Sequence, residues 1–367
     1  MPGSSYGTIF RITTWGESHG KGIGVVVDGC PAGLPLCEED IQVYLNRRKP
    51  GQNKYTTARQ EDDTVEILSG VFEGKTTGTP ISMIVFNKDQ RSRDYSDIAS
   101  YYRPGHADFT FDQKYGFRDY RGGGRSSGRE TIGRVAAGAI ACKILKELGI
   151  TVTAYTRSIG EISCKPENYD FSRLPGSSLC MPDAEAEIRA QLFLDECIEK
   201  QTSSGGTVEC IVKNTFAGIG ETVFDKLDAC LGKALFSIGA VQAVEIGDGI
   251  AVSKALGHEN NDQYICKDGI PQKVSNHAGG ILGGMSDGSD ILIRAAFKPT
   301  PSVSRTQSAL TKDQTCREIS IHGRHDPIII PRAVVVVECM TALTVLDLLL
   351  QNMSATMDNL RTIYHRT

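Results

Sequence analysis

The sequence has little tryptophan, little net charge and no closely spaced cysteines. One tryptophan stands among 367 residues, and 40 Lys and Arg residues face 44 Asp and Glu residues, which leaves a formal net charge of −4. A chain with this balance has no overall electrostatic field that draws it to nucleic acid or to an anionic membrane surface. Any basic site must therefore be a local concentration of arginine and lysine.

The cysteines also exclude classes of protein. The eleven cysteines are scattered along the chain, and no two of them form a C-x-x-C pair. Metal knuckles need close ligand spacing, and disulfide frameworks belong mainly to small secreted chains, so neither is predicted. The N-terminal stretch "MPGSSYGTIFRITTW" lacks the basic start and apolar centre of a signal peptide. We therefore expect a cytoplasmic protein without a bound metal.

The most apolar stretch lies late in the chain, at residues 333–350. It carries Glu338 and Asp347 and is short for a segment that crosses a bilayer. We predict a buried helix that begins near Pro331, and no membrane segment.

Two further helices are predicted from apolar spacing. The first follows the motif "RGGGRSSGRE", where Ser127 and Glu130 have the spacing of a capping box, and it stops at Gly149. Its face is rich in alanine and glycine, so another element can pack against it closely. The side chains of the second recur along one face: Phe224, Leu227, Leu231, Leu235 and Ile238.

Strand patterns occur in runs rather than in strict alternation with helices. Apolar and polar residues alternate at 9–13 and 291–297, residues 23–28 read as a strand, and 65–87 suggests a meander of short strands. Such grouping favours an α+β fold over a doubly wound sheet. No linker or short repeat divides the chain, so one domain over residues 1–367 is expected.

The stretch "RDYRGGGRSSGRE" indicates an anion site. Arg125 and Arg129 flank a predicted helix N-terminus, where the helix dipole disfavours positive charge by about 0.3–1 kcal/mol. A bound anion reverses that penalty, and the free N–H groups of the terminus also bind anions. A plain surface loop is the alternative. An RNA-binding RGG segment is disfavoured, because the motif occurs once in an acidic chain and runs straight into a helix.

Two histidines lie in turns near this motif. "GESHG" fits the G-x-S-x-G pattern with Ser18 as nucleophile, but a strand rather than a helix follows, so that interpretation fails. The sequence supports two interpretations of His19 equally: it contacts a ligand, or it is a structural residue. His106 in "RPGHAD" follows a Pro-Gly turn and is a candidate for proton transfer or ligand contact, with a turn histidine as the alternative.

Two basic stretches complete the candidate site. Arg48 and Lys54 in "RRKPGQNKYTTAR" lie around a turn, where a solvated face is the usual meaning. "GRHDP" sets Arg324 beside Asp326, which suits an anion clamp next to a carboxylate base, with a surface ion pair as the alternative. Together the motifs predict a site for a highly anionic ligand set.

With these motifs in place, the sequence resembles the chorismate synthase family over essentially its whole length. The matching stretches, in family order, are "GESHG", "RRKPG", "DQRSRDYS", "RPGHADFTFDQKYG", "RGGGRSSGRET", "VEIGDG", "GGILGGMSDG", "KPTPS" and "GRHDP". The resemblance implies a β-α-β sandwich with helices between antiparallel sheets, usually a homotetramer. It also implies a lyase that converts 5-enolpyruvylshikimate 3-phosphate to chorismate and phosphate and requires reduced FMN.

The resemblance assigns roles by position. It implies His19 as proton donor to the departing phosphate, His106 at the flavin pyrimidine edge, and Asp326 as an aid to proton removal through flavin N5. The implied FMN contacts are Arg125, Ser126, Ser127, Gly239, Ala240, Gly283, Lys298, Pro299, Thr300, Pro301, Ser302 and Arg324. The implied contacts to substrate or NADP are Arg48, Lys54 and Arg103, with NADPH as a candidate external reductant.

The chain departs from the family pattern at two positions. Lys54 stands where arginine is expected, so a bidentate contact to an anion is lost there. Gly128 stands where alanine is usual, at the first helical position, which loosens the helix start.

Overall fold

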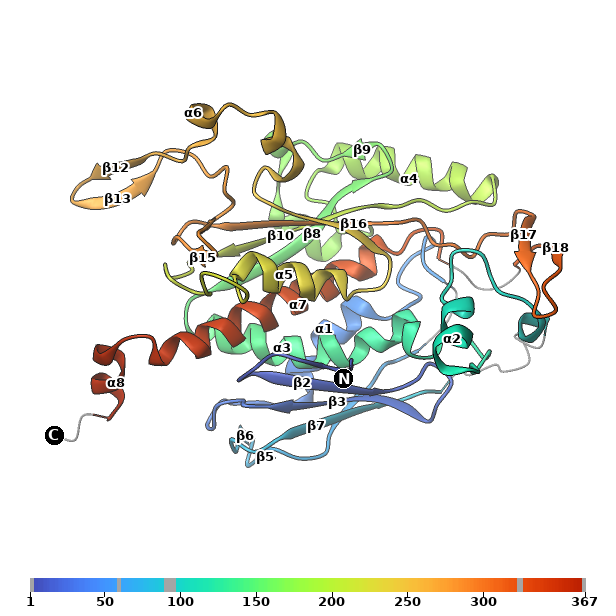
Figure 1. The fold of residues 1–367 in the computed structure, drawn as a ribbon, viewed down its shortest axis with the longest axis horizontal. Coiled ribbons are helices and arrows are strands. Elements are labelled where there is room, and N and C mark those ends of the chain that lie inside the picture. Colours follow the sequence, from blue (N-terminus) through green and yellow to red (C-terminus); the bar gives the residue numbers. More distant parts are fainter. Residues whose placement is uncertain (1–2, 58–60, 89–96, 322–325, 365–367) are drawn as a thin grey trace.

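Two antiparallel sheets with helices between them form the body of the protein (Figure 1). The computed structural model describes residues 3–57, 61–88, 97–321 and 326–364. This arrangement confirms the α+β sandwich expected from the sequence.

The first sheet is five-stranded, in the order β1-β2-β3-β7-β4. Its strands are β1 (Ser5–Tyr6), β2 (Arg11–Gly16), β3 (Gly22–Asp28), β7 (Ile81–Phe86) and β4 (Val65–Ile67). Every pairing in it is antiparallel, and β2 and β3 form a hairpin whose loop carries residues 17–21. The small β5–β6 hairpin (Val71–Phe72 and Lys75–Thr76) lies within the predicted meander.

The second sheet is also five-stranded, in the order β11-β16-β10-β8-β9. Its strands are β11 (Val241–Ile246), β16 (Ile291–Phe297), β10 (Gly206–Lys213), β8 (Thr151–Ile159) and β9 (Ile162–Ser163). Buried and half-buried residues alternate along β16 as the sequence pattern predicts, because successive side chains of a strand point to opposite faces.

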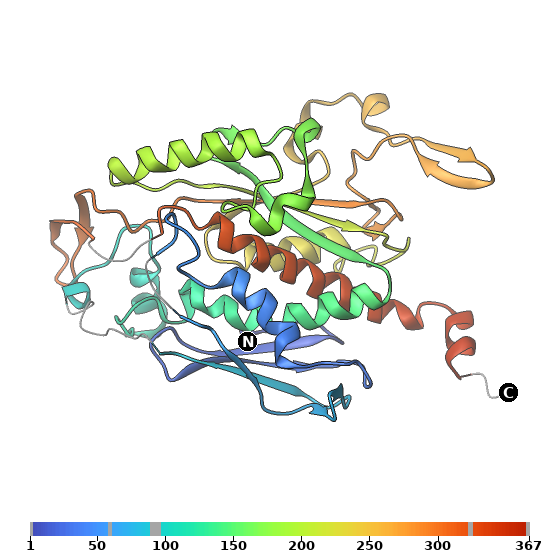
Figure 2. The same cartoon turned by 180° about the vertical axis from the view of Figure 1, so that it is seen from behind.

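Helices fill the space between the sheets. They are α1 (Glu38–Arg48), α3 (Thr131–Glu147), α5 (Leu227–Phe236) and α7 (Ile330–Gln351). α1 and α3 pack on the first sheet, α5 and α7 pack on the second, and α7 contacts the other three helices, an arrangement that Figure 2 shows from behind.

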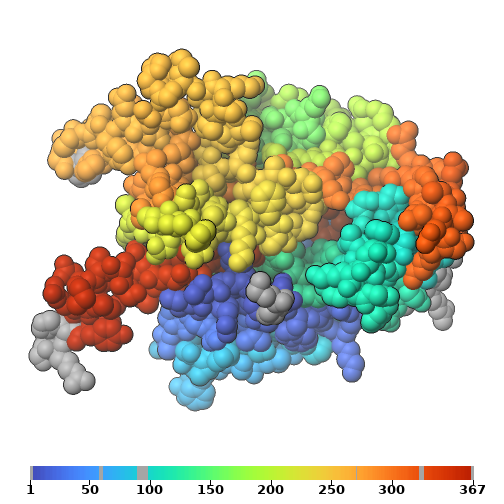
Figure 3. Space-filling model, in the orientation of Figure 1, coloured from blue at the N-terminus to red at the C-terminus, as the bar shows by residue number. Residues whose placement is uncertain are grey.

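Smaller elements surround this body. They are α2 (Asp108–Tyr115), α4 (Ala184–Glu199), α6 (Gly257–Asn260), α8 (Met357–Tyr364), and the hairpins β12–β13 (Tyr264–Lys267, Ile270–Lys273), β14–β15 (Ile281–Leu282, Met285–Ser286) and β17–β18 (Gln307–Leu310, Cys316–Ile319). The β12–β13 hairpin and the C-terminal segment project from one end of the molecule (Figure 3).

Glycines on α3 allow the close packing that its sequence predicts. A Cβ atom added at Gly138 would lie 2.2 Å from the Cβ atom of Cys339 on α7, and one at Gly133 would lie 3.1 Å from the Gly24 carbonyl oxygen on β3. Larger residues at either position would therefore force the helix away from its neighbour.

Helix α7 is the buried helix predicted near Pro331, but it is longer than its apolar run suggested. Residues 330–354 are long and apolar enough to cross a membrane by length and composition, and 94% of that segment's most apolar window is buried inside the protein. Its acidic side chains are satisfied there: Glu338 binds Arg47 at 2.6 Å, and Asp347 accepts hydrogen bonds from three main-chain N–H groups at residues 8–10. Burial in the protein, rather than shortness, identifies α7 as a core helix.

The predicted helix at 224–238 is shorter at both ends. It begins at Leu227, and Phe224 is 90% exposed, outside the helix. The apolar residue Phe224 lies by chance at helical spacing from Leu227, and the spacing alone does not distinguish this loop residue from the residues of the helix.

Candidate active site

A cavity of about 790 Å³ opens where the β2–β3 loop, the start of α3, the segment after β16 and the start of α7 meet. Its lining residues come from two parts of the chain, 18–134 and 237–336, so segments far apart in sequence meet there. The volume falls within the range of about 300–1,000 Å³ that is usual for sites of small ligands.

The cavity is strongly basic. Its charged lining residues are the basic Arg103, Arg125, Arg129, Arg134, Lys298 and Arg332 and the acidic Glu130 and Asp326. Among the residues that the structure describes, six positive charges line the cavity against two negative ones, in contrast with the net charge of −4 on the whole chain. The local concentration of basic residues that the composition demands is therefore present.

The glycine-rich motif forms one wall of the cavity. Gly122 and Gly124 have φ of +75° and +51°, a left-handed conformation that favours glycine. The chain then makes two short 3-10 turns, 124–126 and 128–130, before α3 begins at Thr131. The predicted capping box is wrong: the Ser127 hydroxyl accepts from the Arg129 N–H at 3.3 Å, and the Glu130 carboxylate turns away to Arg134. The 3-10 geometry shifts the spacing on which a capping box depends.

Arg125 is held at the end of β2. Its guanidinium donates to the carbonyl oxygens of Gly16 and Thr14 at 3.1 and 3.2 Å and to the Thr14 hydroxyl at 2.7 Å. These bonds fix a positive charge at the cavity wall.

His19 lies buried in the β2–β3 loop, against the glycine-rich motif. Its Nδ1 lies 3.1 Å from the Ser18 hydroxyl. A Cβ atom added at Gly122 would lie 2.5 Å from the His19 ring, so glycine at 122 is what lets the ring lie there. The strand β3 that follows confirms that "GESHG" is not a nucleophile elbow.

A second wall joins "RPGHAD" to "KPTPS". Lys298 donates to the Gly105 carbonyl oxygen at 2.9 Å, and a Cβ atom at Gly105 would lie 2.7 Å from Pro301. Two segments almost 200 residues apart in sequence thus pack at a glycine, and both line the cavity.

Hydrogen bonds fix the ring of His106 in this wall. Nδ1 lies 3.0 Å from the Pro104 carbonyl oxygen, which can only accept, so Nδ1 carries a proton. Nε2 lies 2.9 Å from the Ser302 hydroxyl, from which it accepts when the ring is neutral. His106 is therefore oriented from both sides.

The turn between α5 and β11 supplies a third wall. Gly239 and Ala240 line the cavity, and Ala240 has φ of +74°, which costs a non-glycine residue about 1–2 kcal/mol. Its carbonyl oxygen accepts from the Lys298 N–H at 2.9 Å. Strained backbone of this kind tends to occur at functional sites.

Asp326 closes the cavity at the start of α7. Its Oδ1 accepts from the Thr57 N–H at 2.7 Å, and its Oδ2 lies 3.0 Å from an Arg332 nitrogen. Both oxygens thus accept from a donor, which fixes the carboxylate at the cavity wall. The neighbours expected from the sequence, Arg324 and His325, lie outside the described residues; Arg332 is the cation that the structure places there.

Arg103 lines the cavity and forms an ion pair with Asp108. Its Nε and one terminal nitrogen donate to Asp108 at 2.8 and 2.7 Å, and Arg118 also pairs with Asp108 at 2.8 Å. Burial raises the pKa of Asp108, but the hydrogen bonds and charge of Arg103 outweigh it, so the pKa lies below its ordinary value.

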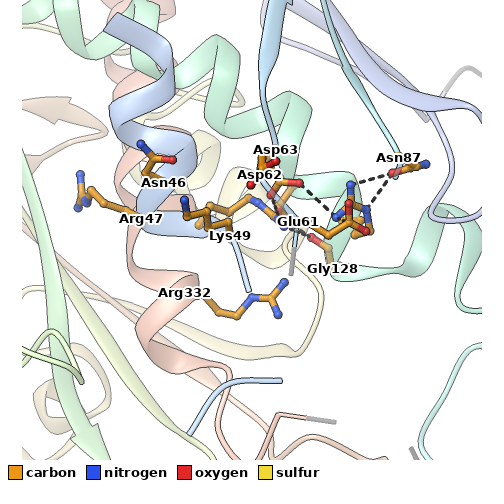
Figure 4. Close-up of polar contacts among 12 residues, drawn as sticks. Asn46, Arg47, Lys49, Glu61, Asp62, Asp63, Asn87, Gly128 and Arg332 are labelled. Atoms are coloured by element: carbon orange, nitrogen blue, oxygen red, sulfur yellow. Dashed lines mark hydrogen bonds and ion pairs between the residues drawn. The ribbon is translucent and has the colours of Figure 1, made fainter. Parts of the chain in front are cut away.

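A buried ion network lies behind the helix start, shown in Figure 4. Arg48 donates to Asp63 at 2.5 Å and to the Gly128 carbonyl oxygen at 3.2 Å, while Arg129 lies 3.2 Å from Asp63 and 3.5 Å from Glu61. Burial raises the pKa of Asp63, but the charges of Arg48 and Arg129 outweigh it and hold that pKa below its ordinary value. Asp63 therefore stays ionised and ties α1 to the start of α3.

We expect Asp63→Asn to lower the free energy of unfolding by about 3 kcal/mol, because two buried guanidinium groups lose their shared carboxylate. Asparagine tolerates the φ of +47° at this position, so the change tests charge rather than backbone. The measurement is urea unfolding at pH 7.

The pH dependence follows from the sign of the pKa shift. Because the pKa of Asp63 is lower in the folded than in the unfolded protein, its carboxylate stabilises the fold at pH values above the unfolded pKa of about 3.9. This stabilisation is lost as the pH falls through the pKa of the folded state. The difference in the free energy of unfolding between the parent and Asp63→Asn should be constant from neutral pH to about pH 5 and should narrow below about pH 4. Asp62→Asn is the matched control, because its carboxylate is 79% exposed and lies 3.8 Å from Lys88; an equal loss in both variants would contradict the role of Asp63.

The structure brings together most of the residues predicted for the site. Those that line the cavity are His19, Arg103, His106, Arg125, Ser126, Ser127, Gly239, Ala240, Lys298, Thr300, Pro301, Ser302 and Asp326. Those that do not line it are Arg48, Lys54, Gly283 and Pro299. Arg324 lies outside the described residues.

Two of the outlying residues have other partners. Lys54 lies 2.8 Å from Asp195 on α4, in an exposed ion pair. Arg48 is buried in the network behind the helix start. Gly283 lies in the turn of the β14–β15 hairpin.

Sequence reasoning missed two basic side chains of the cavity, Arg134 and Arg332, whereas the anion-site motif had already pointed to Arg129 beside Arg125. Arg332 lies in the first turn of α7, where the helix dipole disfavours a cation, which is the signal that singled out Arg125. Arg134 donates to the Ser237 hydroxyl at 2.5 Å, a contact that only the tertiary structure reveals.

Comparison with known proteins agrees with this geometry. The family model for chorismate synthase matches residues 10–350. Chorismate synthases of Agathobacter rectalis and Lachnoclostridium phytofermentans are 63% and 64% identical to the chain, over all of it and all of their own length. A crystal structure of a chorismate synthase superimposes with a TM-score of 0.76 at 31% identity, covering 98% of this chain and 97% of that one. By sequence and by fold, the chain belongs to the chorismate synthase family.

Proposed function

We propose that this lyase converts 5-enolpyruvylshikimate 3-phosphate to chorismate and phosphate by a 1,4-anti-elimination, with reduced FMN bound beside the substrate. The observation that carries the proposal is the strongly basic cavity in an acidic chain, with His19, His106 and Asp326 in its walls. The substrate has two carboxylates and a phosphate, and FMN brings another phosphate. Arginine-rich walls suit such ligands, because guanidinium groups bind carboxylate and phosphate with paired hydrogen bonds.

The wall residues fit an FMN site. Arg125 and Lys298 supply fixed positive charge, and the turns at Ser127 and Gly239 bring main chain to the cavity surface. Reduced FMN, when bound, supplies electron density as phosphate departs and recovers it when hydrogen leaves. The protein contributes position, charge and proton transfer.

The two proposed proton carriers lie on different walls. His19, held by Ser18 and packed on Gly122, donates a proton from its ring to the departing phosphate oxygen. Asp326, held between Thr57 and Arg332, accepts a proton at a carboxylate oxygen. Their separation in the structure allows one group to act as acid and the other as base.

His106 has a positioning role in this proposal. Its ring is fixed by Pro104 and Ser302, in the wall that also carries Lys298. A ring held in one orientation presents a constant hydrogen-bonding pattern to the flavin pyrimidine edge.

The test is an anaerobic assay of phosphate release from 5-enolpyruvylshikimate 3-phosphate, with and without reduced FMN. Release that requires reduced FMN but consumes none supports the proposal. Steady consumption of NADPH without phosphate release would identify a flavin reductase instead. The same assay, run with NADPH and oxidised FMN, tests NADPH as the reductant.

We expect Arg125→Ala to raise the dissociation constant of FMN by about ten- to a hundredfold, because a hydrogen bond to a charged group contributes about 1.5–3 kcal/mol. Isothermal titration of the folded variant measures the change. Thr14→Val is the matched control: it removes one partner of Arg125 but keeps the charge. If Arg125→Ala binds FMN as the parent does, or Thr14→Val loses as much, Arg125 is no FMN contact.

The remaining expectations stay predictions with partial support. Arg48, Lys54 and Arg103 as contacts to substrate or NADP require opening of their present ion pairs. A single domain over 1–367 is supported by one main core cluster that draws on both sheets. A cytoplasmic location is supported by the eleven cysteines, all of which are free. A homotetramer follows only from family membership.

A further inference from the structure

Asn87 joins the His19 loop to the start of α3. It follows the last residue of β7, and β7 pairs with β3 so that Phe86 lies opposite Gly22. This register places Asn87 beside the β2–β3 loop, which carries His19. On its other side lies the first turn before α3, with Arg129.

The donors of Asn87 all point to the His19 loop. Its main-chain N–H binds the Lys21 carbonyl oxygen at 3.1 Å, and its side-chain amide donates to the carbonyl oxygens of Glu17 and Gly20 at 3.0 and 2.9 Å. The Gly20 N–H closes the same turn onto Glu17 at 3.1 Å. The loop is therefore fixed on both sides of His19.

The acceptor of Asn87 points the other way. Its Oδ1 accepts from Nε and a terminal nitrogen of Arg129 at 3.0 and 2.7 Å (Figure 4). Arg129 also lies 3.2 Å from Asp63, so this contact connects the His19 loop to the buried ion network.

The chemistry of the neighbours determines the side chain. Carbonyl oxygens can only accept, and a guanidinium can only donate, so the residue between them needs two donors on one side and an acceptor on the other. An amide of this length meets that requirement, and the same contacts fix which end of the amide is nitrogen. Aspartate keeps the acceptor but loses both donors, and serine can satisfy at most one of the carbonyl groups.

We propose that Asn87 is a positioning residue that holds the His19 ring toward the cavity. The inference rests on the role proposed for His19. Asn87 acts through the loop, and its effect on the reaction passes through the orientation of that ring.

The first test compares Asn87→Asp and Asn87→Ser with the parent enzyme. Because a misplacement of about 1 Å can cost about a hundredfold in rate, we expect kcat to fall about ten- to a hundredfold, with KM within about threefold of the parent value. The neutral serine variant separates the loss of donors from the added charge of aspartate. Asn214→Asp is the matched control, because Asn214 donates to the Gly149 carbonyl oxygen in an exposed turn, away from the cavity; its kcat should be unchanged.

The second test combines Asn87→Ser with His19→Ala. If Asn87 acts through His19, the double variant turns over no more slowly than His19→Ala alone. If Asn87→Ser slows the His19→Ala enzyme by the factor it slows the parent, Asn87 acts by another route and the inference is wrong.

The third test needs no turnover. The NMR signal of the His19 ring, assigned by its loss in His19→Ala, should shift in both Asn87 variants and stay unchanged in Asn214→Asp. An unchanged signal in the two Asn87 variants would overturn the inference. A His19→Ala enzyme at the parent rate would instead refute the proton-donor role, and the NMR comparison would then still decide whether Asn87 positions the ring.

Discussion

Replacing His19 with alanine should lower kcat by about 10²–10⁴-fold, the usual contribution of a group that transfers a proton in the transition state. The ring lies in the cavity wall, buried against Gly122 and held by Ser18. Removing it leaves the departing phosphate without its proposed donor. The basic side chains of the cavity, which are proposed to bind the substrate, are untouched, so KM should change far less than kcat. Anaerobic steady-state phosphate release measures both constants.

The control for this prediction is His258→Ala. His258 lies exposed in the short helix α6, so its loss should leave kcat at the parent value. Circular dichroism and FMN titration establish that His19→Ala is folded and loaded. Turnover of the folded, loaded variant at the parent rate would make His19 a structural residue.

Changing Asp326 to asparagine should lower the single-turnover rate of chorismate formation by about 10²–10⁴-fold, because an amide cannot accept the proton. The structure refines what else changes. Both carboxylate oxygens face donors, Thr57 and Arg332, so the amide nitrogen meets one donor that it cannot satisfy. A modest loss of stability is therefore expected beside the loss of rate. Rapid-quench measurement at saturating substrate separates the chemical step from binding.

The matched control is Asp358→Asn on α8. Asp358 forms an exposed ion pair with Arg361 at 2.7 Å. This is the same type of contact as the one between Asp326 and Arg332, but it lies outside the cavity. Its single-turnover rate should equal that of the parent. Equal rates in Asp326→Asn and the parent would leave Asp326 as the carboxylate half of a structural ion pair.

Patterns local in sequence predicted the elements well. Apolar spacing placed α7 and the long helix α3, and the glycines of α3 predicted close packing by another element, which the structure shows to be α7. The exact start of α3 was not predictable, because two 3-10 turns precede it and change the spacing of Ser127 and Glu130. Local patterns specify the type of an element more firmly than its ends.

The residues that line the cavity were predictable from the sequence only where they belong to a motif of unusual composition. Glycines and arginines in one stretch singled out Arg125, and His19 lies between glycines. Asn87 carries no such signal, because its role depends on two carbonyl groups and a guanidinium that only the folded chain brings to it. The buried pairing of Arg48 with Asp63 was hidden in the same way, since a run of basic residues reads as a solvated surface.

The position of α7 has a consequence for the growing chain on the ribosome. This helix covers the inner face of the second sheet and contacts α1, α3 and α5, yet it follows every strand of both sheets in the chain. Until it has been made, the nascent protein exposes the apolar faces that it later covers, and the cavity lacks Asp326 and Arg332. Ligand binding cannot stabilise such an incomplete chain, because the site does not yet exist. Packing of the two sheets is therefore completed only after α7 has been synthesised, and the apolar faces exposed until then make the chain prone to aggregation.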